Sequence, residues 1–268
     1  MKPWQTVVRY SAIIVAVILI INIALWGLRI LGVGLSIASI GTYEEAKVYS
    51  FNSNGVDKLE IDISAARFVL DSSNGDQIIV KTNIKNLTVK ERGDTLGVKE
   101  KQRLFSANHS DAFVEIYYPI GFEFEDVDID SGTGMLTVIN MTTERLDADL
   151  GAGDTSFGKL TVTKEANIDG GVGHLDFSGA EITDLDLDLG VGHFSFHGIL
   201  NGTNKISFGV GEAFLELSDD KKDYFFDVEK GMGEIEFYGT DDDNFRRENQ
   251  ETAVKVEGGI GKIVIKFN

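Results

Sequence analysis

The chain has 268 residues and no cysteine, which excludes disulfide bonds, thiol chemistry and cysteine-ligated metal centres. Its net charge of −18 is concentrated after residue 41, where 43 acidic side chains stand against 22 basic ones. A body this acidic repels phosphate backbones, so nucleic acid is not expected as a partner, and the plain role of the charge is to keep an exposed domain soluble.

The N-terminal region contains an apolar run long enough to cross a membrane. Residues 10–28 carry no charge, and a helix of that length spans the hydrocarbon core. Because basic residues precede the run and the acidic body follows it, we expect a single-pass protein of the cell membrane with residues 1–9 in the cytoplasm. Residues 29–54 are expected to be a juxtamembrane linker. The alternative is a cleaved signal peptide with a site at Ser36-Ile37-Ala38, although the run is longer than such signals usually are.

An extracytoplasmic domain is expected over residues 55–268, and its first part, 55–125, shows strands of irregular spacing. Residues 59–70 form a degenerate copy of the repeat described next, with Ser64 and Ala66 in place of two glycines. The remaining pattern predicts strands at 77–84, 86–90 and 112–118, loops over 91–111 and a turn at 119–121.

Residues 126–268 repeat a unit built around a G-x-G motif, a period that marks a repeat architecture. The first glycines are 19, 20, 19, 19, 22 and 28 residues apart. The glycine pairs are Gly132 and Gly134, Gly151 and Gly153, Gly171 and Gly173, Gly190 and Gly192, Gly209 and Gly211, Gly231 and Gly233, and Gly259 and Gly261. Polar and apolar side chains alternate on both sides of each pair, which predicts short strands that meet at a glycine corner. The middle residue is mostly apolar, as at Val172, Val191 and Val210, and is expected to point inward.

One such unit cannot bury a core alone, but stacked units can, with equivalent strands about 4.8 Å apart. We therefore expect an all-β fold, a β-solenoid of the parallel β-helix type with about 19–20 residues per coil. An antiparallel sandwich is the alternative. In the solenoid, Phe157, Phe177, Phe196 and Phe237 stack in the core. Residues 240–249 protrude as a loop, and the last strand, 262–267, leaves an open edge.

The order of these features resembles a known family. A degenerate first unit is followed by strand-rich sequence, by IYYPIGFEFEDVDIDSGTGMLTV, and by repeats of the form hydrophobic-Asp-x-Gly-x-Gly-x-hydrophobic-x-hydrophobic. Over residues 55–268 this is similar to the bacterial putative-adhesin β-strand-repeat family. The resemblance implies a domain of unknown function in envelope proteins, often behind a transmembrane segment, with a parallel β-helix fold and in some relatives an association with envelope stress. It implies no catalytic residues.

Two outward columns of the solenoid are candidate cation sites. Asp130, Asp149, Asp169 and Asp188 would stack on one face, where Ca²⁺ could relieve their repulsion, but a solvated strand face with raised carboxyl pKa values explains them as well. A sharper candidate unites Asp154, His174, His193 and Glu212, whose ligand types suit Zn²⁺ or another divalent transition metal.

An enzymatic alternative casts clustered carboxylates such as Asp128, Asp147 and Asp186 as the acids of a carbohydrate-active β-helix enzyme. Strand alternation alone explains the same positions. The sequence therefore favours a non-enzymatic protein without a cofactor. We expect a membrane-anchored binding or scaffolding module whose partner is an envelope polymer or a membrane protein. Signalling in envelope stress, through another membrane protein, is the other alternative.

Overall fold

The computed structural model describes residues 43–101, 111–219, 224–238 and 252–267. The apolar run 10–28, the alternative cleavage site and the insertion 240–249 lie outside these residues. Within the described part of the chain, no helix has the length and apolar character needed to cross a membrane. The strands are β1 (Tyr43–Asn52), β2 (Lys58–Ser73), β3 (Gln77–Ile84), β4 (Leu87–Arg92), β5 (Thr95–Glu100), β6 (Phe113–Pro119), β7 (Phe124–Thr183), β8 (Leu185–Asn201), β9 (Thr203–Leu217), β10 (Tyr224–Tyr238) and β11 (Thr252–Phe267).

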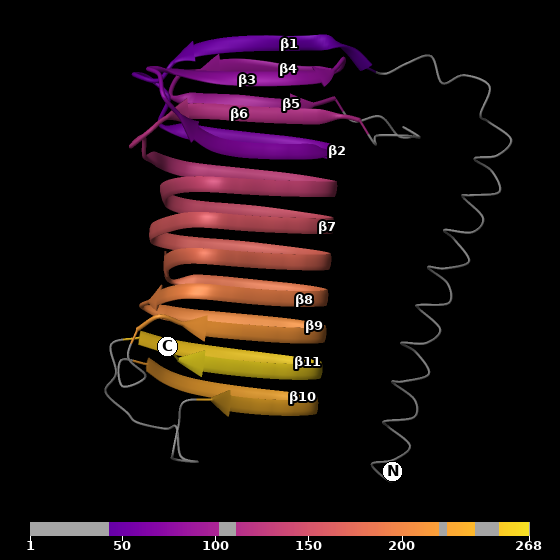
Figure 1. The fold of residues 1–268 in the computed structure, drawn as a ribbon, viewed down its shortest axis with the longest axis vertical. Coiled ribbons are helices and arrows are strands. Elements are labelled where there is room, and N and C mark those ends of the chain that lie inside the picture. Colours follow the sequence, from indigo (N-terminus) through magenta and orange to yellow (C-terminus); the bar gives the residue numbers. More distant parts are fainter. Residues whose placement is uncertain (1–42, 102–110, 220–223, 239–251, 268) are drawn as a thin grey trace, which may run out of the picture. The chain divides into compact units, whose positions relative to one another are not determined.

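These strands belong to one sheet, whose main path runs β1-β3-β6-β2-β7-β8-β9-β11-β10. Figure 1 shows the strands of this body stacked above one another, with the 60-residue β7 winding through several levels. Pairing is parallel from β2 to β10, whereas β1 with β3, β3 with β6 and β4 with β5 pair antiparallel. The expected all-β class is confirmed for the described residues.

Two strands lie where the sequence pattern predicted none. Strand β1 falls inside the segment 29–54 that was expected to be a linker, and β5 falls inside 91–111, expected to be loops. Each is fixed by a neighbour distant in sequence, β1 by β3 and β5 by β2, rather than by a strong pattern of its own. The expected strands 77–84, 86–90 and 112–118 are confirmed as β3, β4 and β6.

The registers join equivalent positions of successive units. The degenerate unit pairs Ile61 with Ile129 and Ala66 with Gly134, as its alignment predicted. Further along, Gly173 pairs with Gly192, and Gly192 pairs with Gly211. Because equivalent positions of successive units pair with each other, a residue type that recurs at one position of the unit forms a column on the body.

The end of the stack differs from the expectation. Strand β11 lies between β9 and β10 and pairs in parallel with both, so β10 is the terminal strand of the sheet path. The expectation that 262–267 forms the open edge is therefore wrong. The physical reason is that β10 leaves a full coil of space beside β9, and the 28-residue interval between the last two G-x-G units gives the chain enough length to return and fill it.

The interior is a column of apolar side chains that alternate with exposed ones along each strand. Its centre holds three of the four phenylalanines expected to stack, and the rings of Phe157 and Phe177 lie parallel with centroids 4.8 Å apart. The side chain of Phe237 lies outside the part of the structure that is described. Phe196 continues the stack at 5.8 Å from Phe177. All three rings are fully buried, so the phenylalanine column is part of a packed core.

Candidate functional site

A row of exposed apolar side chains runs along the glycine corners. It consists of the middle residues of successive G-x-G units, which the registers place side by side in the order Val172, Val191, Val210, Ile260 and Met232. These side chains are 57%, 47%, 40%, 38% and 59% exposed. We call these five residues the corner ridge. The expectation that the middle residue points inward is wrong.

The glycines explain why these side chains point outward. In six of the seven pairs, all but that of Gly233, the second glycine has a positive φ, 158° at Gly192 and 151° at Gly211, which L side chains rarely adopt. The strand bends there, and the interior beside the bend is already filled by the buried Leu189 and Phe194. The residue between the two glycines therefore lies on the convex side of the corner.

The same glycines leave bare main chain on both sides of the ridge. A Cβ atom on Gly192 would lie 1.8 Å from the carbonyl oxygen of Gly173, because the coils stack here backbone on backbone. The first glycines of the pairs, such as Gly171, Gly190 and Gly209, are exposed. The ridge thus stands clear of neighbouring side chains and can be reached from either flank.

The four predicted metal ligands lie in the column that follows the second glycines, two residues after the ridge. His174 pairs with His193 and His193 pairs with Glu212 across neighbouring strands, as expected. His174 Nδ1 lies 2.8 Å from Asp154 Oδ1, and His193 Nδ1 lies 3.8 Å from Glu212 Oε2. The two imidazole rings are tilted by 49° with centroids 6.1 Å apart.

The column is thus divided into two histidine–carboxylate pairs. Among the described residues, no group of three or more His, Cys, Asp or Glu side chains is placed to hold a metal ion. Divalent-cation binding at this column stays a prediction of the sequence.

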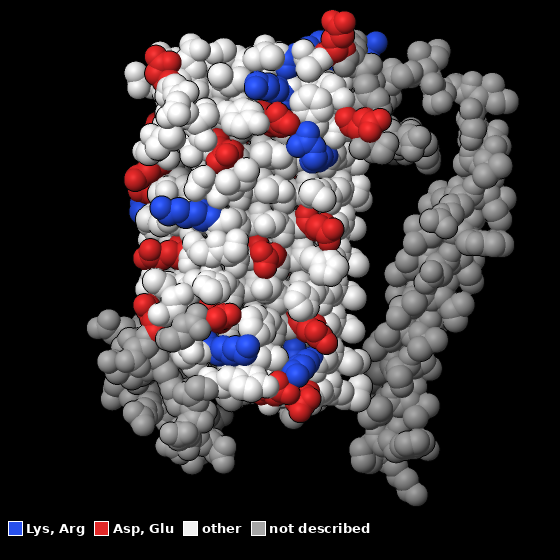
Figure 2. Space-filling model, in the orientation of Figure 1, with Lys and Arg blue, Asp and Glu red and all other residues white. Residues whose placement is uncertain are grey.

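The acidic residues form two neighbouring columns on the outer face before each corner. Asp169 pairs with Asp188, and Asp130 and Asp149 occupy the same position on earlier coils. In the neighbouring column, partial burial raises the pKa of Asp128 and Asp147, and nearby carboxylates add to both shifts. Figure 2 shows that acidic and basic side chains are interspersed with uncharged ones on the face in view. The acidic columns therefore form a solvated face on which neighbouring carboxylates repel one another.

Replacing Asp147 by asparagine should stabilise the body at neutral pH. Because the folded-state pKa of Asp147 is raised above its ordinary value of 3.8, its contribution to stability is present below that pH and is lost as pH rises through the folded-state pKa. We expect Asp147→Asn to raise the melting temperature at pH 7 and to leave it unchanged at about pH 3.5. Thermal melts monitored by circular dichroism measure both, with Asp176→Asn as the control for a general Asp-to-Asn effect. An equal shift at both pH values would contradict the prediction.

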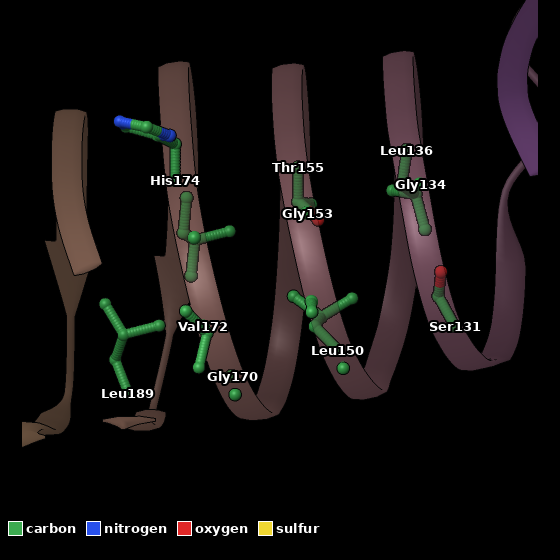
Figure 3. Close-up of a pocket in the computed structure, with 15 residues that line it drawn as sticks. Ser131, Gly134, Leu136, Leu150, Gly153, Thr155, Gly170, Val172, His174 and Leu189 are labelled. Atoms are coloured by element: carbon green, nitrogen blue, oxygen red, sulfur yellow. The ribbon is translucent and has the colours of Figure 1, made fainter. Parts of the chain in front are cut away.

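A small hollow lies behind the ridge at the coil of Val172. Figure 3 shows that successive coils carry Leu150, Gly170 and Leu189 at one position, so the middle coil has no side chain there. The space amounts to about 20 Å³, and Leu189 leans toward it, with Cδ1 only 2.5 Å from where a Cβ on Gly170 would be. A volume of this size holds about one water molecule. This hollow is therefore too small for an organic ligand.

Comparison with known proteins agrees with the predicted resemblance. Residues 56–257 match the model of the Toastrack family, DUF4097. No curated protein matches the chain. A crystal structure described as a putative adhesin from Bacteroides fragilis is similar at 12% identity, with 85% of this chain and 99% of that chain covered and a TM-score of 0.39.

Two further solved structures are similar at the same level. One is a putative cell adhesion protein from Clostridium sporogenes, with 14% identity, 84% and 99% coverage and a TM-score of 0.34. The other is described as a putative lipid binding protein from Parabacteroides distasonis, with 13% identity, 82% and 96% coverage and a TM-score of 0.34. None of these three names describes an enzyme. Because the family model matches residues 56–257, which are most of this chain, the chain belongs to the Toastrack family.

Proposed function

We propose that this chain is a non-enzymatic, membrane-anchored binding module of the bacterial cell envelope that holds a protein partner on its corner ridge. The body is a β-solenoid of the parallel β-helix type, and residues 10–28 form the anchor that keeps it outside the cell. The observation that carries the proposal is the ridge itself, five large apolar side chains exposed in one unbroken column.

A column of this kind is unusual on a soluble surface. Single exposed apolar residues are common, whereas contiguous apolar patches mark interaction sites. Here the ridge residues lie on adjacent strands, so their spacing is the inter-strand distance of about 4.8 Å and the row is about 19 Å long. The bare glycine backbone on both flanks lets a partner close around the side chains.

The chemistry of the ridge favours a protein over a polymer. Its side chains are aliphatic or thioether, and none of the five offers the aromatic face on which sugar rings pack. The carboxylate columns before the corners repel anionic polymers. An apolar groove on another protein fits both features, because the centre of a protein interface is apolar and poor in charge.

The test is site-specific cross-linking with the full chain in its own membrane. A photoreactive amino acid is introduced in place of Val191, and the same residue is introduced at the exposed Ser178, away from the ridge, as the control. We expect a discrete cross-linked protein from position 191 and none from position 178. Changing the neighbouring Val210 to aspartate should reduce that product at least about tenfold, because the charge would be buried unpaired in the interface.

Three outcomes would contradict the proposal. These are equal products from both positions, no product from position 191, and a product with the mass of two copies of this chain. Circular dichroism of the Val210→Asp variant checks that the loss reflects the surface, since Val210 is 40% exposed and its side chain adds little to the core.

A further inference from the structure

The β4–β5 hairpin carries a small basic hollow on a body that is otherwise strongly acidic. Its outer face comes from alternate residues of the two antiparallel strands, and the inner face, with Leu96 and Val98 fully buried, packs into the core. The hollow has a volume of about 70 Å³. We call it the hairpin cup; its β4–β5 lining is Thr88, Lys90, Arg92, Thr95, Gly97 and Lys99.

We propose that the hairpin cup binds a small oxyanion of the phosphate class. The register sets Lys90 opposite Gly97 and Arg92 opposite Thr95, so both cations border an unfilled floor. Ammonium and guanidinium groups are the side chains that bind phosphate best, and a threonine hydroxyl can add a hydrogen bond. The proposal is independent of the corner ridge, because no residue is shared.

The two main cations of the cup are available for a ligand. Within the described part of the chain, neither Lys90 nor Arg92 has a carboxylate at ion-pair distance, although the body carries about twice as many acids as bases. The nearby carboxylates already have partners other than Lys90 and Arg92. Glu60 of β2 lines the cup and pairs with Lys99, and Asp94 in the hairpin turn accepts a hydrogen bond from Thr95 at 3.0 Å.

The floor of the cup is open because Gly97 has no side chain, and the fold does not require glycine there. A Cβ atom on Gly97 would meet only ordinary contacts, at 3.6 Å from the carbonyl oxygen of Lys90 and 3.9 Å from Cε of Lys99. Its φ lies outside the left-handed region. This is the opposite of the corner glycines, where an added Cβ clashes with backbone. The absence of a side chain at Gly97 therefore has its main effect on the space between Lys90, Arg92 and Glu60.

The full-length chain in phosphatidylcholine nanodiscs tests the proposal by calorimetric titration with inorganic phosphate and, separately, with soluble dihexanoyl phosphatidic acid. We expect saturable binding of at least one probe. Two variants should weaken it at least about tenfold, Gly97→Val by filling the cup and Lys90→Gln with Arg92→Gln by removing charge-assisted hydrogen bonds. Lys159→Gln, at an exposed lysine on β7, is the matched control and should bind like the parent chain.

The two probes separate the sources of the anion. Tighter binding of the phosphatidic acid would identify a lipid headgroup, and equal or tighter binding of inorganic phosphate would identify a free or polymeric phosphate. Either result supports the cup if both variants lose it. No saturation by either probe, or saturation unchanged in the variants, would overturn the proposal. The double glutamine variant changes only exposed side chains, so it decides the matter even if Gly97→Val impairs folding.

Discussion

Replacing Gly192 by alanine should lower the free energy of unfolding by about 2–5 kcal/mol, since it combines an unfavourable φ with overpacking. The new Cβ would lie 1.8 Å from the carbonyl oxygen of Gly173, and that atom belongs to a paired strand that cannot turn away like a flexible side chain. Gly211 on the next coil packs against Gly192 in the same way, so any shift of Gly192 disturbs both neighbours.

The effect should also be local. In a stacked repeat, each coil is stabilised mainly by its neighbours, so a break at Gly192 weakens the coupling between the parts on either side. Urea unfolding followed by hydrogen exchange measures this, and we expect faster exchange in β8 and β9 than in β2 and β3. Gly55→Ala is the control, because its Cβ would meet nothing within 4 Å. An unchanged unfolding midpoint for Gly192→Ala would show that the corner tolerates a side chain.

The second large effect is expected at Asn204, a buried amide that joins three strands. Its Oδ1 accepts a hydrogen bond from the Leu185 amide of β8 at 3.1 Å. Its Nδ2 donates to the carbonyls of Asn201 at 3.1 Å and of Ala253, in β11, at 3.3 Å. Asn204→Leu keeps the number and branching of the side-chain heavy atoms, in a somewhat larger side chain, but leaves these main-chain groups without their partner. We expect a loss of about 2–4 kcal/mol, because unsatisfied buried polar groups are costly.

Chemical denaturation of Asn204→Leu measures this loss, with Asn167→Leu at an exposed position of β7 as the control for adding a leucine. The Leu185 amide should in addition exchange its hydrogen faster in the variant. If Asn204→Leu were as stable as the parent chain, the amide would not hold β8 and β11 to β9.

Much of the fold could be predicted because the repeat carries it. Period-two alternation predicts that Leu175 and Phe177 point inward and His174 outward, and in the structure the first two are buried and the third is exposed. Alternation reports the face of a residue within a strand, which is a local property. It fails at the corner itself, where the bend breaks the period, and so the direction of Val191 was predicted wrongly.

The order of the last strands could not be predicted for a related reason. Val228 of β10 and Val256 of β11 occupy equivalent positions, so the core pattern fits either order. Only the long interval between their G-x-G units indicated that the chain has enough length to pass β10 and pair with β9. Asn204 did leave a signal, since this polar residue pairs with the apolar Val254 and lies against the main chain of the apolar Leu185.

Of the candidate sites, the sequence located the histidine column but missed the corner ridge and the hairpin cup. The ridge depends on the outward turn at the glycines. The cup depends on β5, whose short sequence holds a glycine and charges and becomes a strand only through pairing with β2 and β4. Both sites depend on where the folded chain places these residues, and composition and motif spacing do not predict that.

The position of β11 has a consequence for the synthesis of the protein. The ribosome makes β10 before β11, yet β10 reaches its final partner only when β11 is present to lie against β9. The last two positions of the sheet path can therefore be completed only after β11 has been synthesised. In a chain interrupted before residue 252, β9 would lack its native partner β11, and β10 could pair with β9 in its place because the two strands occupy equivalent positions, which would give a shortened stack with a non-native end.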